Sequence, residues 1–199
     1  MARSSGVLEF AVLGLLHDSP MHGYELRKRI GSALGTFRAY SYGSLYPALK
    51  TMTSEGLIAA DDASGAGRRS KIVYRLTADG KERFQELVSE SGPASWEDEA
   101  FGVHLAFFAR TNKDVRLRIL EGRRSRLEER LDTLRTSLRQ ASERVDSYTL
   151  ALQEHGLESV EREVRWLNEL IATEREDSPS SRGSKAVLDA PAQQRNNKE

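Results

Sequence analysis

Apolar side chains recur every three or four residues in three segments of the first 55 residues. This spacing places them on one face of a helix. The expected helices and their buried faces are 7–17 with Leu8, Val12 and Leu15, 22–34 with Leu26, Ile30 and Leu34, and 42–55 with Leu45, Leu49 and Met52. Gly56 directly follows the third segment and is a typical helix stop. The chain therefore opens with three short amphipathic helices.

A period of two replaces the helical spacing in residues 57–77. In the second half of this segment Ile72, Tyr74 and Leu76 alternate with the side chains between them, which is typical of a half-buried strand. The run Gly65-Ala66-Gly67-Arg68-Arg69 separates this strand from an earlier one. The segment therefore predicts a β-hairpin with a glycine-rich, arginine-bearing tip.

Thr77 follows the hairpin and is expected to cap a helix at 78–91. Three helices, a hairpin and a closing helix are the order of a winged helix-turn-helix, in which the hairpin is the wing. The first domain is therefore expected at 1–91.

Helical signals return after the break at Gly92-Pro93-Ala94. Ser95 with Asp98, and Thr111 with Asp114, match capping boxes. They predict a helix at 96–109 and the start of a second, very long helix. Apolar residues at alternating spacings of four and three then form a heptad seam, made of Leu127, Leu131, Leu134, Leu138, Ala141, Val145, Tyr148 and Leu152. Gly156 is expected to end this helix, and a last helix is expected at 157–176.

The heptad seam needs a covering surface. A helix of this length has little else in the chain to pack against, which favours pairing with a second copy along Leu127, Leu131, Leu134, Leu138, Val145, Tyr148 and Leu152. The alternative is a helix packed within its own domain. The fold expected is thus mainly α with a small β-hairpin wing, in which a helical, coiled-coil dimerisation domain at 95–176 follows the winged domain. The polar segment 177–199 is expected to be a disordered tail.

Composition limits the function classes. The chain contains no cysteine, which excludes disulfides and thiolate metal sites, and it has no secretory or membrane-spanning apolar run, so a cytoplasmic location is expected. Formal net charge is zero, and residues 1–91 hold 12 Lys and Arg against 10 Asp and Glu. Binding to nucleic acid would therefore depend on a local basic patch.

The third predicted helix presents an unusual outward face. Opposite its buried face lie Gly43, Pro47 and Lys50, so this side is small or flat where a recognition helix would approach DNA. Pro47 has no N–H to donate to the Gly43 carbonyl. Regular hydrogen bonding is therefore expected to begin near Ser44, with Pro47 in the first turn.

Hydroxyl groups gather at the start of this helix. Ser41, Tyr42 and Ser44 are candidates for phosphate contacts at the positive end of the helix dipole. Tyr42 and Tyr46 could also touch sugars or base edges, and Lys50 lies further along. For Tyr46 the alternative is a core aromatic with its hydroxyl at the rim.

Basic residues outside this helix complete the candidate DNA-binding set. Arg68, Arg69 and Lys71 lie at the wing, where arginine suits phosphates or a narrow minor groove; the alternative is a solvated loop tip. Lys28 is a candidate backbone contact from the second helix, although a basic run is more often a solvated face.

Three stretches carry a resemblance to a known family. "LEFAVLGLLHDSPMHGYELRKRI", "SYGSLYPALKTMTSEGLI" and "KIVYRLTADGKERF" resemble the PadR family of bacterial transcriptional regulators over residues 7–88. By length and order, the second half is similar to the C-terminal helical domain of the larger, virulence-activator-like subgroup. The resemblance implies a homodimer that binds palindromic operators, most often as a repressor and sometimes in response to a small molecule.

Other functions fit less well. A protein-interaction adaptor, with winged helix and coiled coil but no DNA binding, is the alternative. An enzyme is not expected, because no Gly-x-Ser-x-Gly motif or phosphate-binding glycine loop is present. Neither a cofactor nor a metal is expected, since His17 and His22 have no carboxylate pair at ligand spacing. The aromatic residues of the second half, Trp96, Phe101, Phe107, Phe108 and Trp166, are either plain core or the lining of an effector pocket.

Overall fold

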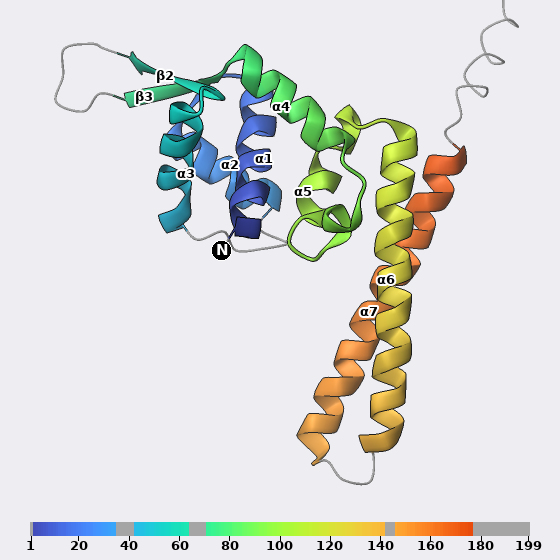
Figure 1. The fold of residues 1–199 in the computed structure, drawn as a ribbon. Helices are drawn as coiled ribbons and strands as arrows, with labels where there is room; N and C mark the ends of the chain where they lie inside the picture. Colours follow the sequence, from blue (N-terminus) through green and yellow to red (C-terminus); the bar gives the residue numbers. More distant parts are fainter. Residues whose placement is uncertain (1, 35–41, 64–70, 142–145, 177–199) are drawn as a thin grey trace, which may run out of the picture.

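The computed structural model describes residues 2–34, 42–63, 71–141 and 146–176. An N-terminal group of helices carries a small sheet, and two long helices form a rod beside it (Figure 1). The elements are α1 (Ala2–Asp18), β1 (Met21–His22), α2 (Gly23–Leu34), α3 (Tyr42–Ser54), β2 (Ile58–Ala63), β3 (Lys71–Leu76), α4 (Ala78–Ser89), η1 (Pro93–Trp96), α5 (Phe101–Ala106), η2 (Phe108–Arg110), α6 (Lys113–Ala141) and α7 (Ser147–Glu176).

The first 90 residues form a winged helix-turn-helix. The predicted hairpin is confirmed as β2 and β3, which pair antiparallel with Ile58 opposite Leu76. The two-residue strand β1 adds to the other edge of β3, giving the order β1-β3-β2, with Met21 opposite Tyr74. Strand β1 was not expected from the sequence, because two residues are too few to show a periodicity.

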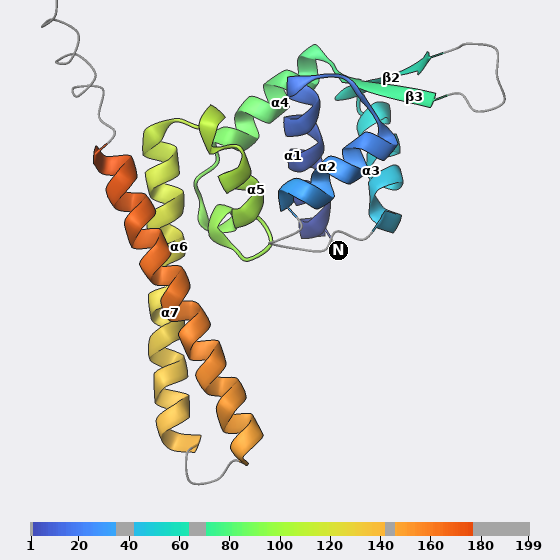
Figure 2. The same cartoon turned by 180° about the vertical axis from the view of Figure 1, so that it is seen from behind.

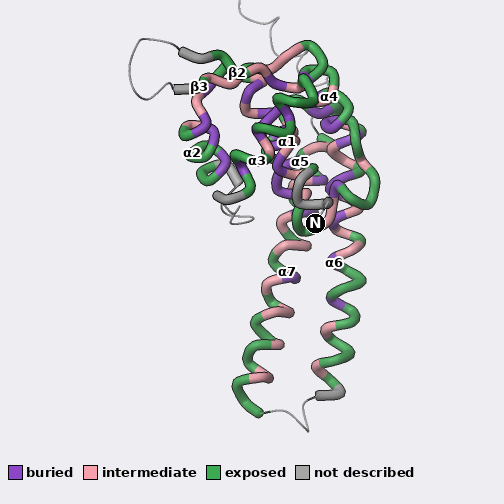
Figure 3. Tube along the Cα trace, turned by 60° about the vertical axis from the view of Figure 1, so that its left-hand side comes forward, coloured by how far each residue is buried: buried purple, intermediate pink, exposed green. Residues whose placement is uncertain are grey.

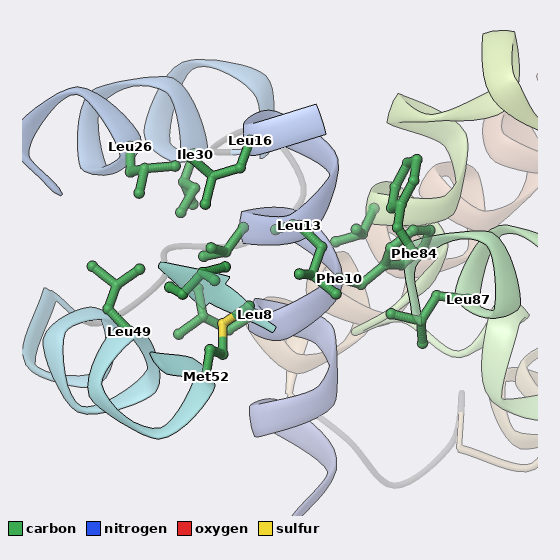
Figure 4. Packing of buried hydrophobic residues seen from close by; sticks show 14 of the residues in the cluster. Leu8, Phe10, Leu13, Leu16, Leu26, Ile30, Leu49, Met52, Phe84 and Leu87 are labelled. Carbon is green, nitrogen blue, oxygen red and sulfur yellow. The ribbon is translucent and has the colours of Figure 1, made fainter. Parts of the chain in front are cut away.

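Helix α1 runs through the centre of the N-terminal core. Ala11, Val12 and Leu13 have no solvent exposure. Their neighbours come from α2, α3 and α4, as seen from close by in Figure 4. Burial of these apolar stripes is the main source of stability for short helices of this kind.

Helix α5 belongs to the same core. Val103 and Phe107 are buried with the α1 residues, and the Phe107 ring packs against Gly14, where an added Cβ would lie 2.1 Å from the ring. The N-terminal core therefore extends past the expected domain end at residue 91, and α5 lies between the winged domain and the rod (Figure 1).

The start of α4 is tied to the start of the wing by Thr77, whose predicted capping role is confirmed. Its hydroxyl oxygen accepts a hydrogen bond from Gly80 N at 3.0 Å and lies 2.7 Å from the Gly56 carbonyl and 2.8 Å from the Leu57 carbonyl. Gly56 itself has φ of 77°, which suits glycine at the turn after α3.

The prediction of one helix at 96–109 is wrong. The chain makes a 3-10 turn at η1, a bend and the short α5 instead. Ser95 donates a hydrogen bond to the Glu90 carbonyl at 3.2 Å and does not cap a helix. The carboxylates of Glu97 and Asp98 pair with Arg126 and Arg123 on α6, so tertiary ion pairs replace the expected capping box.

The long heptad helix is also wrong as predicted. Helix α6 ends at Ala141 and α7 begins at Ser147, so the seam belongs to two antiparallel helices that pack on each other (Figure 2). Asp146 caps α7: its carboxylate accepts hydrogen bonds from Tyr148 N at 2.9 Å and Thr149 N at 3.1 Å. Gly156 lies inside α7 and does not end a helix.

This arrangement changes the meaning of the seam residues. Leu127 and Leu131 are buried against α7 with Val160 and Leu167, so the same chain covers them and they are not available to a second copy. Leu134 and Leu138 are half-buried, whereas Tyr148 is 87% and Leu152 71% exposed. Burial thus decreases toward the far end of the rod (Figure 3), and Val145 lies outside the described residues.

Two further predictions from the sequence concerned membrane-spanning segments and the C-terminal tail. Among the described helices, none has an apolar stretch long enough to cross a membrane. The segment 177–199, expected to be disordered, lies outside the residues that the structure describes.

Candidate nucleic-acid interface

Helix α3 has the two faces expected of a recognition helix. Leu45, Leu49 and Met52 are buried in the N-terminal core. On the opposite side Pro47 and Lys50 are exposed, as the helical spacing predicted. Packing by one face leaves the other available to a partner.

Helix α3 begins earlier than the sequence predicted, which changes the place of Pro47 in it. The helix begins at Tyr42, two residues before Ser44, so Pro47 lies within the helix and not in its first turn. Because proline has no N–H, the Gly43 carbonyl receives no helical hydrogen bond from residue 47.

A groove of about 840 Å³ opens beside the first half of α3. We call it the tyrosine groove, because three tyrosines from three elements line it. Its walls come from β1, α2, α3 and β3, and its lining residues are His22, Gly23, Tyr24, Glu25, Lys28, Arg29, Ser32, Tyr46, Ile72 and Tyr74. The groove therefore joins the recognition helix to the base of the wing.

Tyr46 is the residue of α3 that lines this groove. Its side chain is 55% exposed, so it is not the core aromatic that the sequence left as an alternative. An added Cβ on Gly23 would lie 3.2 Å from the Tyr46 ring and 3.5 Å from the Tyr74 ring, so glycine lets the start of α2 approach both. Burial, and then the neighbouring Tyr46, raises the pKa of Tyr74, which keeps its hydroxyl protonated as a hydrogen-bond donor.

Polar groups on α2 form the opposite wall. Lys28 is exposed as predicted, and Arg29 is paired with Glu25 at 2.8 Å. Tyr24 is 72% exposed, so it is not a packed residue. The His22 Nδ1 lies 3.2 Å from the Ile72 carbonyl across the sheet. This wall offers a cation and a phenol to a ligand.

The structure describes the other predicted DNA contacts to different extents. Ser44 and Lys50 are exposed on α3, outside the groove. For Tyr42 and Lys71 only the backbone is described, at the start of α3 and of β3. Ser41, Arg68 and Arg69 lie outside the described residues.

Tyr74 was not expected from the sequence as a member of the site, and Tyr24 was left as either a packed or a phosphate-contacting residue. The alternation in β3 put Ile72 and Tyr74 on one face of the strand, which is a usable signal. It did not show that this face turns toward α2, because that depends on the pairing of β1 with β3.

A second hollow, which we call the α4–α5 cavity, lies away from α3. Its volume is about 360 Å³, and α1, α4, the segment 93–100 and α5 contribute its walls. The five aromatic residues proposed from the sequence as a pocket lining do not line it. Phe107 packs in the N-terminal core, and Phe101 makes an edge-on contact with Trp166 in the rod.

His104 is the most buried ionisable residue of this cavity. Burial lowers its pKa from 6.5 to about 4, so the imidazole is neutral near pH 7. Cavity residues with formal charge are Arg83, Glu90, Glu97 and Glu99. Within the described residues, no group of three metal-ligating side chains is present here or elsewhere.

The shifted pKa of His104 predicts a loss of stability in mild acid. The unfolded chain takes up a proton near pH 6.5 and the folded chain only near pH 4, so the free energy of unfolding decreases as pH falls between these values. From pH 7.5 to pH 5 the contribution of this residue should fall by about 2 kcal/mol. Urea unfolding of the His104→Leu variant should lack this part of the pH dependence. An identical pH dependence in both proteins would contradict the burial of a neutral imidazole.

Comparison with known proteins finds a matching family and several similar proteins. Residues 12–86 match the transcriptional regulator PadR-like family. By its description, this family consists of transcriptional regulators.

The similarity of the PadR-like domain extends to individual proteins. It includes 31% identity over 87 residues to the negative transcriptional regulator PadR of Bacillus subtilis, which covers 44% of this chain and 48% of the relative, so the match spans about half of that protein. Solved structures of B. subtilis PadR with operator DNA and with p-coumaric acid are both 23% identical. They cover 84% and 85% of this chain and 99% of each PadR chain, with TM-scores of 0.43 and 0.40.

Proposed function

We propose that this chain is a sequence-specific DNA-binding transcriptional regulator in which α3 and the tyrosine groove contact the duplex. The observation that carries the proposal is the exposure of Lys50, Pro47 and Tyr46 on α3 and of Tyr24 and Lys28 on α2, three of which, Tyr46, Tyr24 and Lys28, line the tyrosine groove. These residues lie within the segment 12–86, which matches the PadR-like family of transcriptional regulators.

The chemistry of this surface suits a duplex. Lysine ammonium groups and tyrosine hydroxyls bind phosphate oxygens and set the position of a protein on DNA. The flat side of α3 at Pro47 lets the helix come close to base edges in the major groove. Arg68, Arg69 and Lys71 of the wing, with Ser41, Tyr42 and Ser44 before and at the start of α3, are proposed as further contacts.

We further propose a homodimer that binds a palindromic operator as a repressor in the cytoplasm. Tyr148 and Leu152 leave apolar surface exposed on α7, at the far end of the rod, which favours a second copy of the chain as the partner. Two-fold pairing would present two α3 helices to one DNA face, so the operator should be an inverted repeat. Repression is taken from the relative, a negative regulator.

Lysine substitutions test the proposed interface. Lys50→Gln and Lys28→Gln should each weaken binding to a selected operator by roughly fivefold and reduce the slope of log Kd against log salt by about 0.9 for each phosphate that the protein no longer neutralises. A dimer carries each change twice, so the slope should change by about twice that value. Fluorescence anisotropy across a series of salt concentrations measures both quantities.

Arg165→Gln is the matched control for this experiment. Arg165 is an exposed cation on α7, so its removal alters the net charge equally but should leave the salt slope unchanged. Equal effects of all three substitutions would mean that the assigned face has no special part in binding. Binding of a protein partner with no response to DNA would favour the adaptor function.

A further inference from the structure

The tyrosine groove holds most of the large apolar side chains that the described residues leave exposed. Tyr24 is 72%, Tyr46 55% and Ile72 41% exposed, and all three line the groove. Among the described residues, the other two such side chains, Tyr148 and Leu152, lie on α7 at the far end of the rod. Single exposed apolar side chains are ordinary, whereas several at one place mark a site of interaction.

Phosphate contacts alone do not account for this lining. A phosphate oxygen accepts hydrogen bonds, which the Lys28 ammonium group and the hydroxyls of Tyr24 and Tyr46 can donate. The Ile72 side chain has no polar atom, and the two exposed tyrosine rings are apolar apart from their hydroxyls. A partner that fills the groove therefore has to supply an apolar group as well as oxygen acceptors.

The apolar lining comes from three elements that meet at Gly23. An added Cβ on Gly23, at the start of α2, would lie 3.2 Å from the Tyr46 ring and 3.5 Å from the Tyr74 ring. Ile72 precedes Tyr74 by two residues on β3, so both side chains lie on the same side of the strand. The apolar lining is thus shared by α3 and the base of the wing.

Duplex DNA offers one apolar group on the base edges of its major groove, the C5-methyl group of thymine. A recognition helix enters this groove by its N-terminal end, and Tyr46 is the fifth of the 13 residues of α3. Helix α3 and the hairpin of β2 and β3 lie at the same end of the molecule, away from the rod (Figure 1). A methyl group on a base beside α3 would therefore meet apolar side chains.

We propose that the tyrosine groove reads thymine, with the Tyr46 ring and the Ile72 side chain packing on the C5-methyl group and Tyr24 adding to this apolar wall from α2. The inference rests on the proposed function, because it names what the groove recognises in the operator. Loss of one buried methyl group corresponds to about a fourfold loss of affinity. The loss should be roughly 15-fold where a two-fold symmetric operator lacks the methyl group in both half-sites.

Deoxyuridine tests the proposal, because it differs from thymidine only in lacking the C5-methyl group. The thymines of the selected operator are replaced by uracil one symmetric pair at a time, and binding of the full chain is measured by fluorescence anisotropy. At least one pair should weaken binding by roughly 15-fold. Deoxyribose is also partly apolar, but it is unchanged by this replacement, so contact with sugars would give no difference.

Variants assign the methyl contact to the groove. Tyr46→Ala and Ile72→Thr should each reduce the difference between the thymine and uracil operators to below about fourfold, whereas Tyr46→Phe, which keeps the ring, should retain it. Lys28→Gln is the matched control from the same groove and should weaken both operators alike, since its ammonium group is proposed to contact phosphate. Ile72 is 41% exposed, so Ile72→Thr serves if Tyr46→Ala fails to fold.

Three results would overturn the inference, and they differ in what they leave standing. An operator without thymine, or equal binding of the thymine and uracil operators at every position, would leave the proposed DNA binding intact. A difference that persists in both Tyr46→Ala and Ile72→Thr would place the methyl contact outside the groove. Absence of binding to any operator would refute the regulator function itself, and the reading of thymine with it.

Discussion

Gly80→Ala is expected to lower the free energy of unfolding by about 3 kcal/mol, because α4 and the start of the wing are too close for a methyl group. An added Cβ would lie 2.0 Å from the Leu57 carbonyl oxygen and 2.9 Å from a Leu76 methyl group. The oxygen is part of the backbone and cannot move as a side-chain end would. Urea unfolding followed by circular dichroism measures the loss.

The same close approach explains why the Gly80 substitution should act beyond its own position. The Leu57 carbonyl lies within hydrogen-bond distance of both the hydroxyl and the N–H of Thr77, the residue that caps α4. Moving Leu57 away would stretch these hydrogen bonds and shift β2 relative to α4. Operator binding should therefore weaken together with stability, since the wing is proposed to contact DNA.

Gly31→Ala is the control. Gly31 is exposed within α2, and nothing lies within 4 Å of an added Cβ. Alanine should stabilise the helix there by roughly 0.5 kcal/mol, because it has the higher helix propensity. If Gly80→Ala were equally well tolerated, the close packing of α4 on the wing would be incorrect.

Arg123→Met is expected to cost about 3 kcal/mol of unfolding free energy, since it removes a buried cation from two carboxylates. The guanidinium donates to Glu163 on α7 at 2.8 and 2.9 Å, to the Trp96 carbonyl at 3.0 Å and to the Asp98 carboxylate. It also lies over the Phe101 ring, 5.3 Å from its centroid. One side chain thus joins η1, the segment before α5 and both helices of the rod.

Arg123→Lys should recover only part of the loss, because an ammonium cannot reproduce the planar fork that reaches these acceptors together. Arg135→Met is the matched control: Arg135 pairs with Glu161 across the same two helices at 2.8 Å but is half exposed, so less than about 1 kcal/mol should be lost. Urea unfolding compares the variants. Equal losses at positions 123 and 135 would contradict the special part of the buried arginine.

The winged domain was predictable because each of its signals is local. Leu45, Leu49 and Met52 have helical spacing on α3, and the alternation in β3 is uninterrupted. Thr77 stands directly before a helix whose N–H groups need a cap. Strand β1 is the exception, since its existence depends on pairing with β3.

The rod was mispredicted because the apolar spacing of α6 continues in step into α7, although these are two separate helices. Residues 142–145 include no glycine or proline, so spacing alone joined α6 to α7. The local signal was Asp146 with Thr149, whose hydroxyl donates to the Asp146 carboxylate at 2.6 Å. An aspartate at this position is a typical N-cap, which marks a helix start inside the apparent seam.

The residues of the candidate sites also fall into two groups, those that local spacing could predict and those that only tertiary packing brings together. Lys50 could be placed outward from α3 spacing alone, whereas Tyr24 and Tyr74 join Tyr46 only through the packing of α2 against β3. His104 lies in a segment that was predicted from the sequence to be one continuous helix. It is buried because the short helix α5 packs against α1. Long-range packing of this kind leaves no periodic trace in a single sequence.

Selection of binding sites from random duplex DNA, followed by footprinting of the selected sequence, tests the proposed function most directly. The account predicts an enriched inverted repeat whose half-sites are centred about 34 Å apart, with both halves protected on one face of the duplex. Failure to enrich any sequence over the starting pool, or enrichment of a single unrepeated site, would contradict a dimeric regulator that reads DNA with two α3 helices.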